Sequence, residues 1–392
     1  MNRLPRRLLV ALAIGPIAAL SVFYLWPFGT LLVEALTGEA VSETLRRPQT
    51  WDVLWFTLWQ AAVSTAVTLT VGLAPAYVVA RFDFVGRSLL IGLLTATFVL
   101  PTVVMGAAFL ALLPDSLDRT VWAVIAAHVA FNLAVVVRVV GALWEHLPTD
   151  MEHAAATLGA SRWHVFTQIS LPLIRPAITA AATVVFLFTF TSFGVIRILG
   201  APGTRTIEVE VWRRATQLGD IGGAAVLALI QLAVLAIGLA WSTLAQRRHS
   251  RALALQPTAE RQSARSPGER AFVAAAAGGA ALVALVPLTA LVLRSFSTPT
   301  GWSTRAWTEL GRMEVRPGIR VGVDPVEAIV NSLSTMAWAT LFAVVIGGVA
   351  SLAITAAQRH GRLIDGGLML PLGTSAVTIG LGMLITFDAP PA

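Results

Sequence analysis

Residues 151–176 read MEHAAATLGASRWHVFTQISLPLIRP, and this stretch decides how the chain around it is organised. It is polar and helix-prone, and one glycine, Gly159, divides it in two. Glycine tolerates the left-handed backbone that ends a helix, and Ser161 suits the N-cap of a second short helix. Pro172 should end that second helix, and Pro176 should lie near the start of a membrane span. The stretch therefore predicts a helix–turn–helix whose small residues let a partner approach closely.

The composition of the rest of the chain is that of a membrane protein. Its 392 residues have a mean hydropathy of +0.76, and only 12% of them are charged, about half the share of a soluble domain. With no cysteine and with arginine as every one of the 28 basic residues, disulfides, a phosphate-binding P-loop and a Schiff-base lysine are excluded. The net charge of +7 is ascribed to cytoplasmic arginines rather than to nucleic-acid binding. An all-α polytopic transmembrane helical bundle is predicted.

About nine apolar segments are long enough to cross a bilayer core about 30 Å thick. Pro101 interrupts the third of them. The first is interpreted as an uncleaved span rather than a signal peptide, because its apolar run is too long and no convincing cleavage site follows. The predicted spans are residues 8–33, 53–80, 88–114, 121–143, 177–196, 221–245, 271–293, 328–357 and 366–387.

The distribution of arginines predicts the topology. Residues 246–270 hold six arginines together with proline, glycine and serine, and they are expected to form a flexible cytoplasmic linker. With the N-terminus also in the cytoplasm, residues 151–176 fall on the cytoplasmic side. Residues 34–52 and 197–220 then become outer loops, and 294–327 becomes an outer segment although it too is basic.

The spacing within residues 151–176 resembles the cytoplasmic coupling loop of ATP-binding-cassette importer permeases. That loop reads Glu-Ala-Ala, three residues, Gly, nine residues, Ile, one residue, Leu-Pro. The positions that match are Ala154, Ala155, Gly159, Ile169, Leu171 and Pro172. The family's glutamate falls on His153, with Glu152 one place early, so a salt bridge from this position is in doubt. The alternative for the stretch is an ordinary amphipathic interfacial helix.

An internal repeat follows the linker. Gly72 and Gly86 have counterparts 275 residues later, at Gly347 and Gly361 (347 − 72 and 361 − 86). Leu100-Pro101 likewise has a counterpart in Leu370-Pro371. The chain is accordingly divided into a first span with its outer loop (1–52), a permease unit (53–245), the linker (246–270) and an incomplete second unit (271–392). This doubling resembles the fused permeases of ferric-iron and thiamine importers, whose halves have six spans each, so spans ten to twelve are expected to be missing.

The resemblance implies a permease in the bacterial inner membrane that works by alternating access and is not an enzyme. It implies no cofactor in this chain, with ATP and magnesium bound by a partner ATP-binding subunit. A solute-binding protein and a second permease chain are the other expected partners. The implied solute is ferric iron, then thiamine, then another small anion or a polyamine. The alternatives are a secondary transporter, which usually carries an intramembrane carboxylate not found here, and a membrane-embedded enzyme, which lacks a catalytic constellation here.

Polar residues within the predicted spans are candidates for a translocation path. They are His128, Asn132, Thr189, Thr191 and Ser192. Each has an alternative interpretation as a hydrogen-bonding residue between helices, which is the commoner use of such side chains in a membrane.

Overall fold

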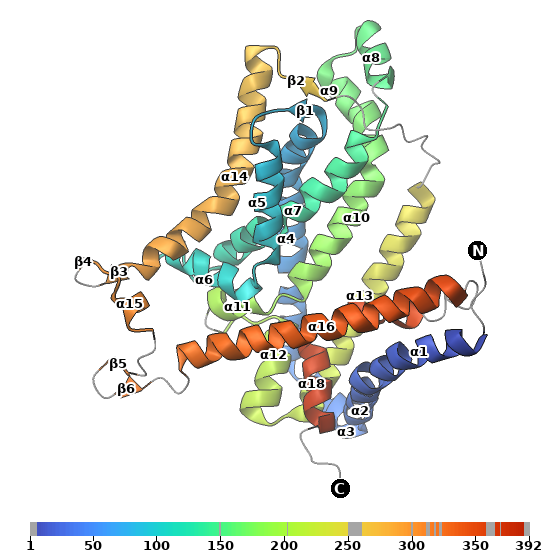
Figure 1. Cartoon of the computed structure of the whole chain (residues 1–392), viewed down its shortest axis with the longest axis vertical. Coiled ribbons are helices and arrows are strands. Elements are labelled where there is room, and N and C mark those ends of the chain that lie inside the picture. Colours follow the sequence, from blue (N-terminus) through green and yellow to red (C-terminus); the bar gives the residue numbers. More distant parts are fainter. Residues whose placement is uncertain are drawn as a thin grey trace. The chain divides into compact units, whose positions relative to one another are not determined.

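The computed structural model describes residues 6–148, 150–201, 203–249, 261–298, 301–310, 314–316, 319–320, 324–357, 365–368 and 370–387. Nearly all of them are helical, which confirms the predicted all-α class (Figure 1). Within these residues, seven helices are long and apolar enough to cross a membrane, or eight if the bent pair α5 and α6 counts as one span. The chain folds into two compact units, residues 42–219 with 227–291, and residues 1–41 with 220–226 and 292–392.

The first of these units holds the residues singled out above. Its elements are α4 (Pro48–Arg81), β1 (Phe82–Asp83), α5 (Arg87–Val99), α6 (Thr102–Leu112), α7 (Val121–Glu145), α8 (Asp150–Thr157), α9 (Arg162–Val165), η2 (Phe166–Ser170), α10 (Leu171–Phe190), α11 (Gly194–Leu199), α12 (Ile207–Arg213), η3 (Arg214–Leu218), β2 (Gln262–Ser263), and most of α13 (Ile221–His249) and α14 (Pro267–Ser295).

Three long helices, α4, α7 and α10, pack together to form the centre of this unit (Figure 1). Gly72 lets α4 and α7 approach closely, because a Cβ on it would lie 2.7 Å from Cγ1 of Val136. Ala76 and Ala181 are fully buried in the same cluster, and Trp144 closes it at the end of α7. α7, which precedes residues 151–176, and α10, which follows from them, also pack side by side.

The third predicted span breaks at Pro101, as expected, but far more sharply than a kink. The axes of α5 and α6 meet at 104°. Gly194 at the start of α11 allows that helix to lie against α6, because a Cβ there would lie 2.6 Å from the backbone nitrogen of Val103. α6 and α11 thus pack as a pair of short helices.

Three segments predicted to be loops or linker contain regular structure that was not predicted from the sequence. Residues 38–46 form α3 (Gly38–Arg46), and the predicted outer loop 197–220 contains α12, which is buried around Ile207 and Val211. The end of the predicted flexible linker is also ordered, because Gln262–Ser263 pairs in parallel with Phe82–Asp83 and α14 already begins at Pro267. Residues 250–260 of the linker lie outside the described residues.

The other unit contains α1 (Arg6–Leu20), η1 (Ser21–Leu25), α2 (Trp26–Ala35), β3 (Ser297–Thr298), β4 (Gly301–Trp302), α15 (Arg305–Thr308), β5 (Glu314–Arg316), β6 (Ile319–Arg320), α16 (Pro325–Ala357), η4 (Leu370–Gly373) and α18 (Ala376–Phe387). In it α1 packs on α16 and α2 packs on α18. The hydroxyls of Tyr24 and Thr374 lie 2.6 Å apart, and those of Thr30 and Thr386 lie 2.5 Å apart.

The ninth predicted span is not a continuous helix. Leu370–Gly373 forms a short 3-10 turn, and α18 has only 12 residues, too few to cross a hydrocarbon core alone. Pro371 cannot donate a backbone hydrogen bond, so the segment breaks there. Leu100-Pro101 lies at the break between α5 and α6, whereas its counterpart in the internal repeat, Leu370-Pro371, lies within the 3-10 turn.

Candidate functional site

Residues 151–176 are called the coupling loop below after the resemblance, and their turn has the predicted geometry. Gly159 has a φ of +83°, in the left-handed region. Its N–H donates to the carbonyl of Ala156 at 3.0 Å, and the N–H of Ala160 donates to the carbonyl of Ala155 at 3.0 Å. This pair of bonds is a Schellman motif, which ends α8. The hydroxyl of Ser161 then accepts from the N–H of His164 at 3.3 Å and caps α9 as expected.

Pro172 does not end the second helix of the loop, and that prediction was wrong. Residues Arg162–Phe190 form one helix of 29 residues. Within it η2 is a π-helical turn in which the N–H of Leu171 donates to the carbonyl of Phe166, five residues back. This wider turn accommodates a proline that has no N–H of its own. The second helix of the coupling loop is therefore continuous with α10, whereas α8 is a separate helix.

Glu152 ties the loop to a second membrane helix. Its carboxylate accepts a hydrogen bond from the hydroxyl of Ser170 at 2.7 Å and lies 3.5 Å from the guanidinium of Arg81 at the end of α4. Arg81 is only 6% exposed and also donates to the carbonyl of Leu147 at 3.2 Å. Glu152 thus makes the salt bridge that the sequence left in doubt, and it makes it within the chain. The side chain of His153 lies outside the described residues.

A further link joins the loop to α14, and the sequence analysis missed it. Arg162 lies 3.5 Å from Glu269. Glu269 is held in place by a capping box, in which its N–H donates to the hydroxyl of Ser266 at 3.2 Å and its carboxylate accepts from the N–H of Ser266 at 3.3 Å. The spacing Ser-x-x-Glu before an apolar run was the available signal. The basic composition of residues 246–270 concealed it.

The outer surface of the loop is apolar and exposed. Leu158 is 88% exposed, Trp163 is 72% exposed and Met151 is 53% exposed. The motif residues Ala154 and Pro172 are exposed as well, whereas Ala155, Ile169 and Leu171 are half-buried. Several large apolar side chains exposed in one polar segment are typical of a surface for a protein partner.

Beneath the loop lies a cavity of about 790 Å³, within the size range of small-molecule sites. Its walls come from α4, the coupling loop and the start of α14. Aromatic side chains form much of the lining, and Tyr77 and Trp144 pack with ring centroids 5.0 Å apart. Glu152 and Glu269 both line it, so the two ionic links described above lie at its wall.

The polar residues at the centre of the bundle lie between helices. His128 is 2% exposed, and its two ring nitrogens lie 3.1 Å from the Ser64 hydroxyl on α4 and 2.8 Å from the Ser192 hydroxyl. Asn132, 1% exposed, donates to the carbonyl of His128 at 2.9 Å. His128 therefore connects α7 to α4 and to the segment that joins α10 to α11.

The threonines of α10 are engaged in the same way. Thr189 is fully buried and donates to the carbonyl of Val185 at 2.9 Å, and its own carbonyl accepts from the side-chain amide of Gln60 at 2.9 Å. Thr191 donates to the carbonyl of Leu187 at 2.8 Å. Each of the five candidate path residues thus makes a hydrogen bond within the protein, although the buried side-chain oxygen of Asn132 has no partner among the described residues.

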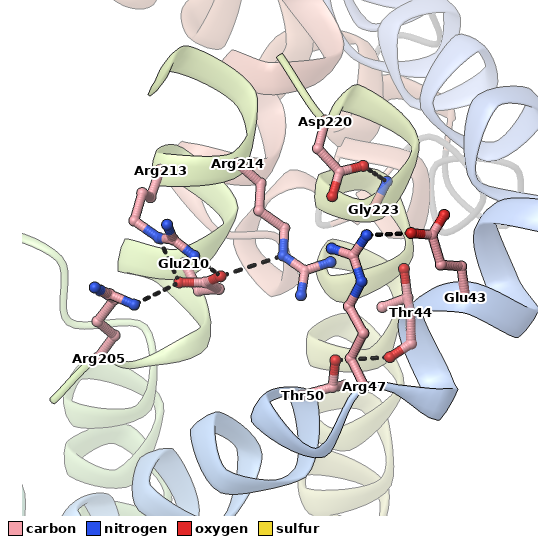
Figure 2. A network of polar contacts seen from close by, with 10 residues as sticks. All are labelled: Glu43, Thr44, Arg47, Thr50, Arg205, Glu210, Arg213, Arg214, Asp220 and Gly223. Carbon is pink, nitrogen blue, oxygen red and sulfur yellow. Dashed lines mark hydrogen bonds and ion pairs between the residues drawn. The ribbon is translucent and has the colours of Figure 1, made fainter. Parts of the chain in front are cut away.

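At the opposite end of α10 from the coupling loop, α12 carries a concentrated ionic network that the sequence analysis did not predict (Figures 1 and 2). Glu210 accepts two hydrogen bonds from Arg213, at 2.9 and 2.6 Å, and one from Arg214 at 3.2 Å. Arg205 lies 3.6 Å from the same carboxylate. Burial raises the pKa of the Glu210 carboxyl, but the hydrogen bonds and positive charges of Arg213 and Arg214 outweigh it and lower the pKa overall.

Comparison with known proteins places this geometry in a family. The family described as "Binding-protein-dependent transport system inner membrane component" matches residues 69–251. The chain is 31% identical to the thiamine transport system permease protein of Escherichia coli, over 56% of this chain and 43% of that protein. It is also 31% identical to the sulfate transport system permease protein of Escherichia coli, over 52% of this chain and 80% of that protein.

A solved structure has the same fold. It is a bacterial ABC transporter involved in the import of the acidic polysaccharide alginate, with a TM-score of 0.54 and 17% sequence identity, covering 62% of this chain and 96% of that one. The chain spans less than half the length of the thiamine permease and most of the length of the sulfate permease. On this evidence the chain belongs to the family of binding-protein-dependent transport system inner membrane components.

Proposed function

We propose that this chain is the permease subunit of an ATP-driven importer in the bacterial inner membrane, with the N-terminus in the cytoplasm. The observation that carries the proposal is the coupling loop, which is exposed and apolar on its outer surface yet continuous with a membrane helix. Leu158 and Trp163 offer the partner surface, and Gly159 fixes the turn between the two short helices. A segment of this kind transmits force in a way that a freely floating interfacial helix does not.

In the proposed mechanism the energy comes from the partner. The ATP-binding subunit binds ATP and magnesium, closes, and displaces the coupling loop that it holds. Because residues 162–190 form one helix, α10 moves with the loop, and the contact between Glu152 and Arg81 draws α4 along. Moving two of the three central helices together would switch the permease between outward-open and inward-open states.

The polar residues of the bundle centre have a supporting role in this proposal. His128 and Asn132 on α7, with Thr189, Thr191 and Ser192 at the end of α10, would hold the central helices in fixed positions while the loop moves. The hydrogen bonds that His128 makes with Ser192 and with Ser64 on α4 support this role over direct contact with the solute.

The proposed partners are an ATP-binding subunit, an extracytoplasmic solute-binding protein that delivers the solute, and a second permease chain. The fused arrangement favours ferric iron or thiamine as solute, and the thiamine permease among the relatives supports thiamine. The sulfate permease among the relatives supports a small oxyanion. An oxyanion differs from both iron and thiamine in the sign of its charge, so the electrostatics of the chain bear on this choice.

The test is capture of the candidate ATP-binding subunit by the chain in detergent, comparing wild type with Gly159→Pro. Proline cannot adopt a φ near +83° and removes the N–H that donates to Ala156, so the turn must change. Gly86→Pro is the matched control, because Gly86 has a φ of +89° in the turn after α4, at the same end of the unit. We expect capture by wild type and by Gly86→Pro and its loss in Gly159→Pro. Equal capture by all three would remove the coupling loop from the interface.

A further inference from the structure

The cavity beneath the coupling loop is lined by a connected series of aromatic rings. Each ring packs on the next, with centroids between 5.0 and 6.3 Å apart. The members of the series are Phe82, Phe272, Tyr77, Trp144, Phe166 and Trp163. They come from α4, β1, α7, α9, η2 and α14. Because aromatic faces and edges pack best on another flat ring, these walls suit a planar ligand.

Trp144 adds a hydrogen-bond donor to this lining. Its side chain is 1% exposed, and its indole N–H has no acceptor within the described part of the chain. An indole nitrogen can only donate, and a buried donor without an acceptor is unfavourable. A ligand that carries an acceptor atom in or beside its ring would satisfy this group. A lipid acyl chain offers neither a flat face nor an acceptor.

The charges around the cavity are balanced. Among the residues that the structure describes, those that line it and carry a charge are Glu152, Arg162 and Glu269. Glu152 lies 3.5 Å from Arg81, and Glu269 lies 3.5 Å from Arg162. Two carboxylates are thus paired with two guanidinium groups, and neither sign is in excess. An ion would lose its hydration here without gaining a free counterion, so the walls favour an uncharged ligand.

We propose that this cavity is a binding site for an uncharged, planar heteroaromatic molecule whose ring acceptor takes the N–H of Trp144. The volume of about 790 Å³ exceeds that of a two-ring body, so a ligand with substituents also fits. The ligand would lie between the coupling loop, α4 and the start of α14, because all three contribute to the walls.

A role for this ligand in transport rests on the proposed permease function. The two ionic links at the wall differ in strength. Arg81, which holds the loop to α4, is 6% exposed, whereas Arg162, which links the loop to α14, is 91% exposed. An exposed ion pair contributes little, so the loop should separate from α14 more readily than from α4. A ligand that fills the space between them would oppose this movement and inhibit transport.

The experiment is protection of an introduced cysteine from a water-soluble maleimide, in the full chain in lipid nanodiscs. The chain has no cysteine of its own. Ala156→Cys places a thiol in the cavity lining. Ala154→Cys is the matched control, because Ala154 is an exposed alanine on the same helix that does not line the cavity. We expect quinoline to slow alkylation of Ala156→Cys in a saturable manner and to leave Ala154→Cys unaffected.

Probes with the same two-ring body test the hydrogen bond and the charge. Trp144→Phe keeps an aromatic ring and removes the N–H. The smaller ring should weaken quinoline and naphthalene alike, but naphthalene has no acceptor to lose. The ratio of their affinities should therefore shift against quinoline by about two- to tenfold. N-methylquinolinium and naphthalene-2-sulfonate carry one charge each and should bind about tenfold more weakly than quinoline.

A second pair of substitutions tests the aromatic wall. Phe272 is 42% exposed, and its ring lies 6.1 Å from that of Tyr77 in the cavity lining. Phe272→Ala should weaken quinoline and naphthalene by about two- to tenfold with little risk to folding. Phe188→Ala removes an equally exposed ring, 43% exposed, that does not line the cavity, and it should leave protection unchanged.

Four results would overturn this site: quinoline protection of neither cysteine or of both, equal effects of Phe272→Ala and Phe188→Ala, an unchanged probe ratio in folded Trp144→Phe, or tighter binding of either charged probe. The assay needs no partner, so it is independent of the capture of the ATP-binding subunit. Capture without protection would leave the permease proposal in place and remove the site. Protection without capture would leave the site in place and remove its effect on ATP-driven transport.

Discussion

The contact of Glu152 with Ser170 and Arg81 should govern how firmly the coupling loop is held. Glu152→Ala removes the acceptor that lies 2.7 Å from the Ser170 hydroxyl and leaves Arg81, which is 6% exposed, without this carboxylate. A hydrogen bond to a charged group contributes roughly 1.5–3 kcal/mol. Because Glu152 is 21% exposed and the Arg81 contact is long at 3.5 Å, we expect a loss of about 2 kcal/mol in the free energy of local opening.

Hydrogen–deuterium exchange of the chain in nanodiscs measures this directly. A loss of about 2 kcal/mol should speed exchange of the α8 amides by about 30-fold. Glu152→Gln keeps an acceptor for Ser170 and should have about half the effect on the free energy. Glu43→Ala, which breaks an exposed i,i+4 pair with Arg47, is the control and should cost less than about 0.5 kcal/mol. Exchange of α8 at the wild-type rate in Glu152→Ala would refute the reasoning.

Three more substitutions test other parts of the structure by thermal unfolding. His128→Leu leaves two buried serine hydroxyls without their partner, so stability should fall by about 1–3 kcal/mol, and an unchanged melting temperature would contradict this. The lowered pKa of Glu210 means that its ionised form stabilises the protein above its ordinary pKa of 4.5, and that this contribution is lost as the pH falls through the lowered value. Glu210→Gln should therefore melt earlier than wild type at pH 7, with a smaller difference in acid; a constant difference would refute the assignment. Gly194→Ala places a Cβ 2.6 Å from a backbone nitrogen and should cost about 1–3 kcal/mol, whereas Gly92→Ala, with open space around it, should stabilise α5 by roughly 0.5–1 kcal/mol; equal effects would disprove the close contact.

Local signals in the sequence predicted the features that depend on neighbouring residues. Composition and the length of apolar runs gave the helical membrane bundle and most of its spans. Gly159 and Ser161 ended one short helix and capped the next, since both act through backbone groups within three residues of themselves. Pro101 broke its helix for the same local reason.

Pro172 shows where local reasoning failed. Proline disfavours a helix interior, yet the π-helical turn that precedes it absorbs the missing hydrogen bond and the helix continues. The prediction for the end of the linker failed for a different reason. Its arginines suggested a solvated segment, but Gln262 pairs with Phe82, 180 residues earlier (262 − 82). A single sequence gives no signal for a pairing at that distance.

The ionic contacts of the site also could not be predicted from the sequence. Arg81 and Glu152 are 71 residues apart and meet only because α4 and α7 pack along their length. Glu210 on α12 and Arg214, the first residue of η3, have the i,i+4 spacing of an ion pair on a helix. That spacing was available, but predicting a loop over residues 197–220 concealed it.

The central claim is that the coupling loop is the surface on which the ATP-binding subunit docks. The chain has no cysteine, so a single one introduced at Leu158 or at Val85 reports on one position alone. Both side chains are exposed at the same end of the unit, Leu158 at 88% and Val85 at 104%. We predict that Leu158→Cys cross-links efficiently to the ATP-binding subunit through a short thiol-reactive linker and that Val85→Cys does not. Cross-linking at Val85 alone, or at neither position while the complex stays assembled, would contradict the account.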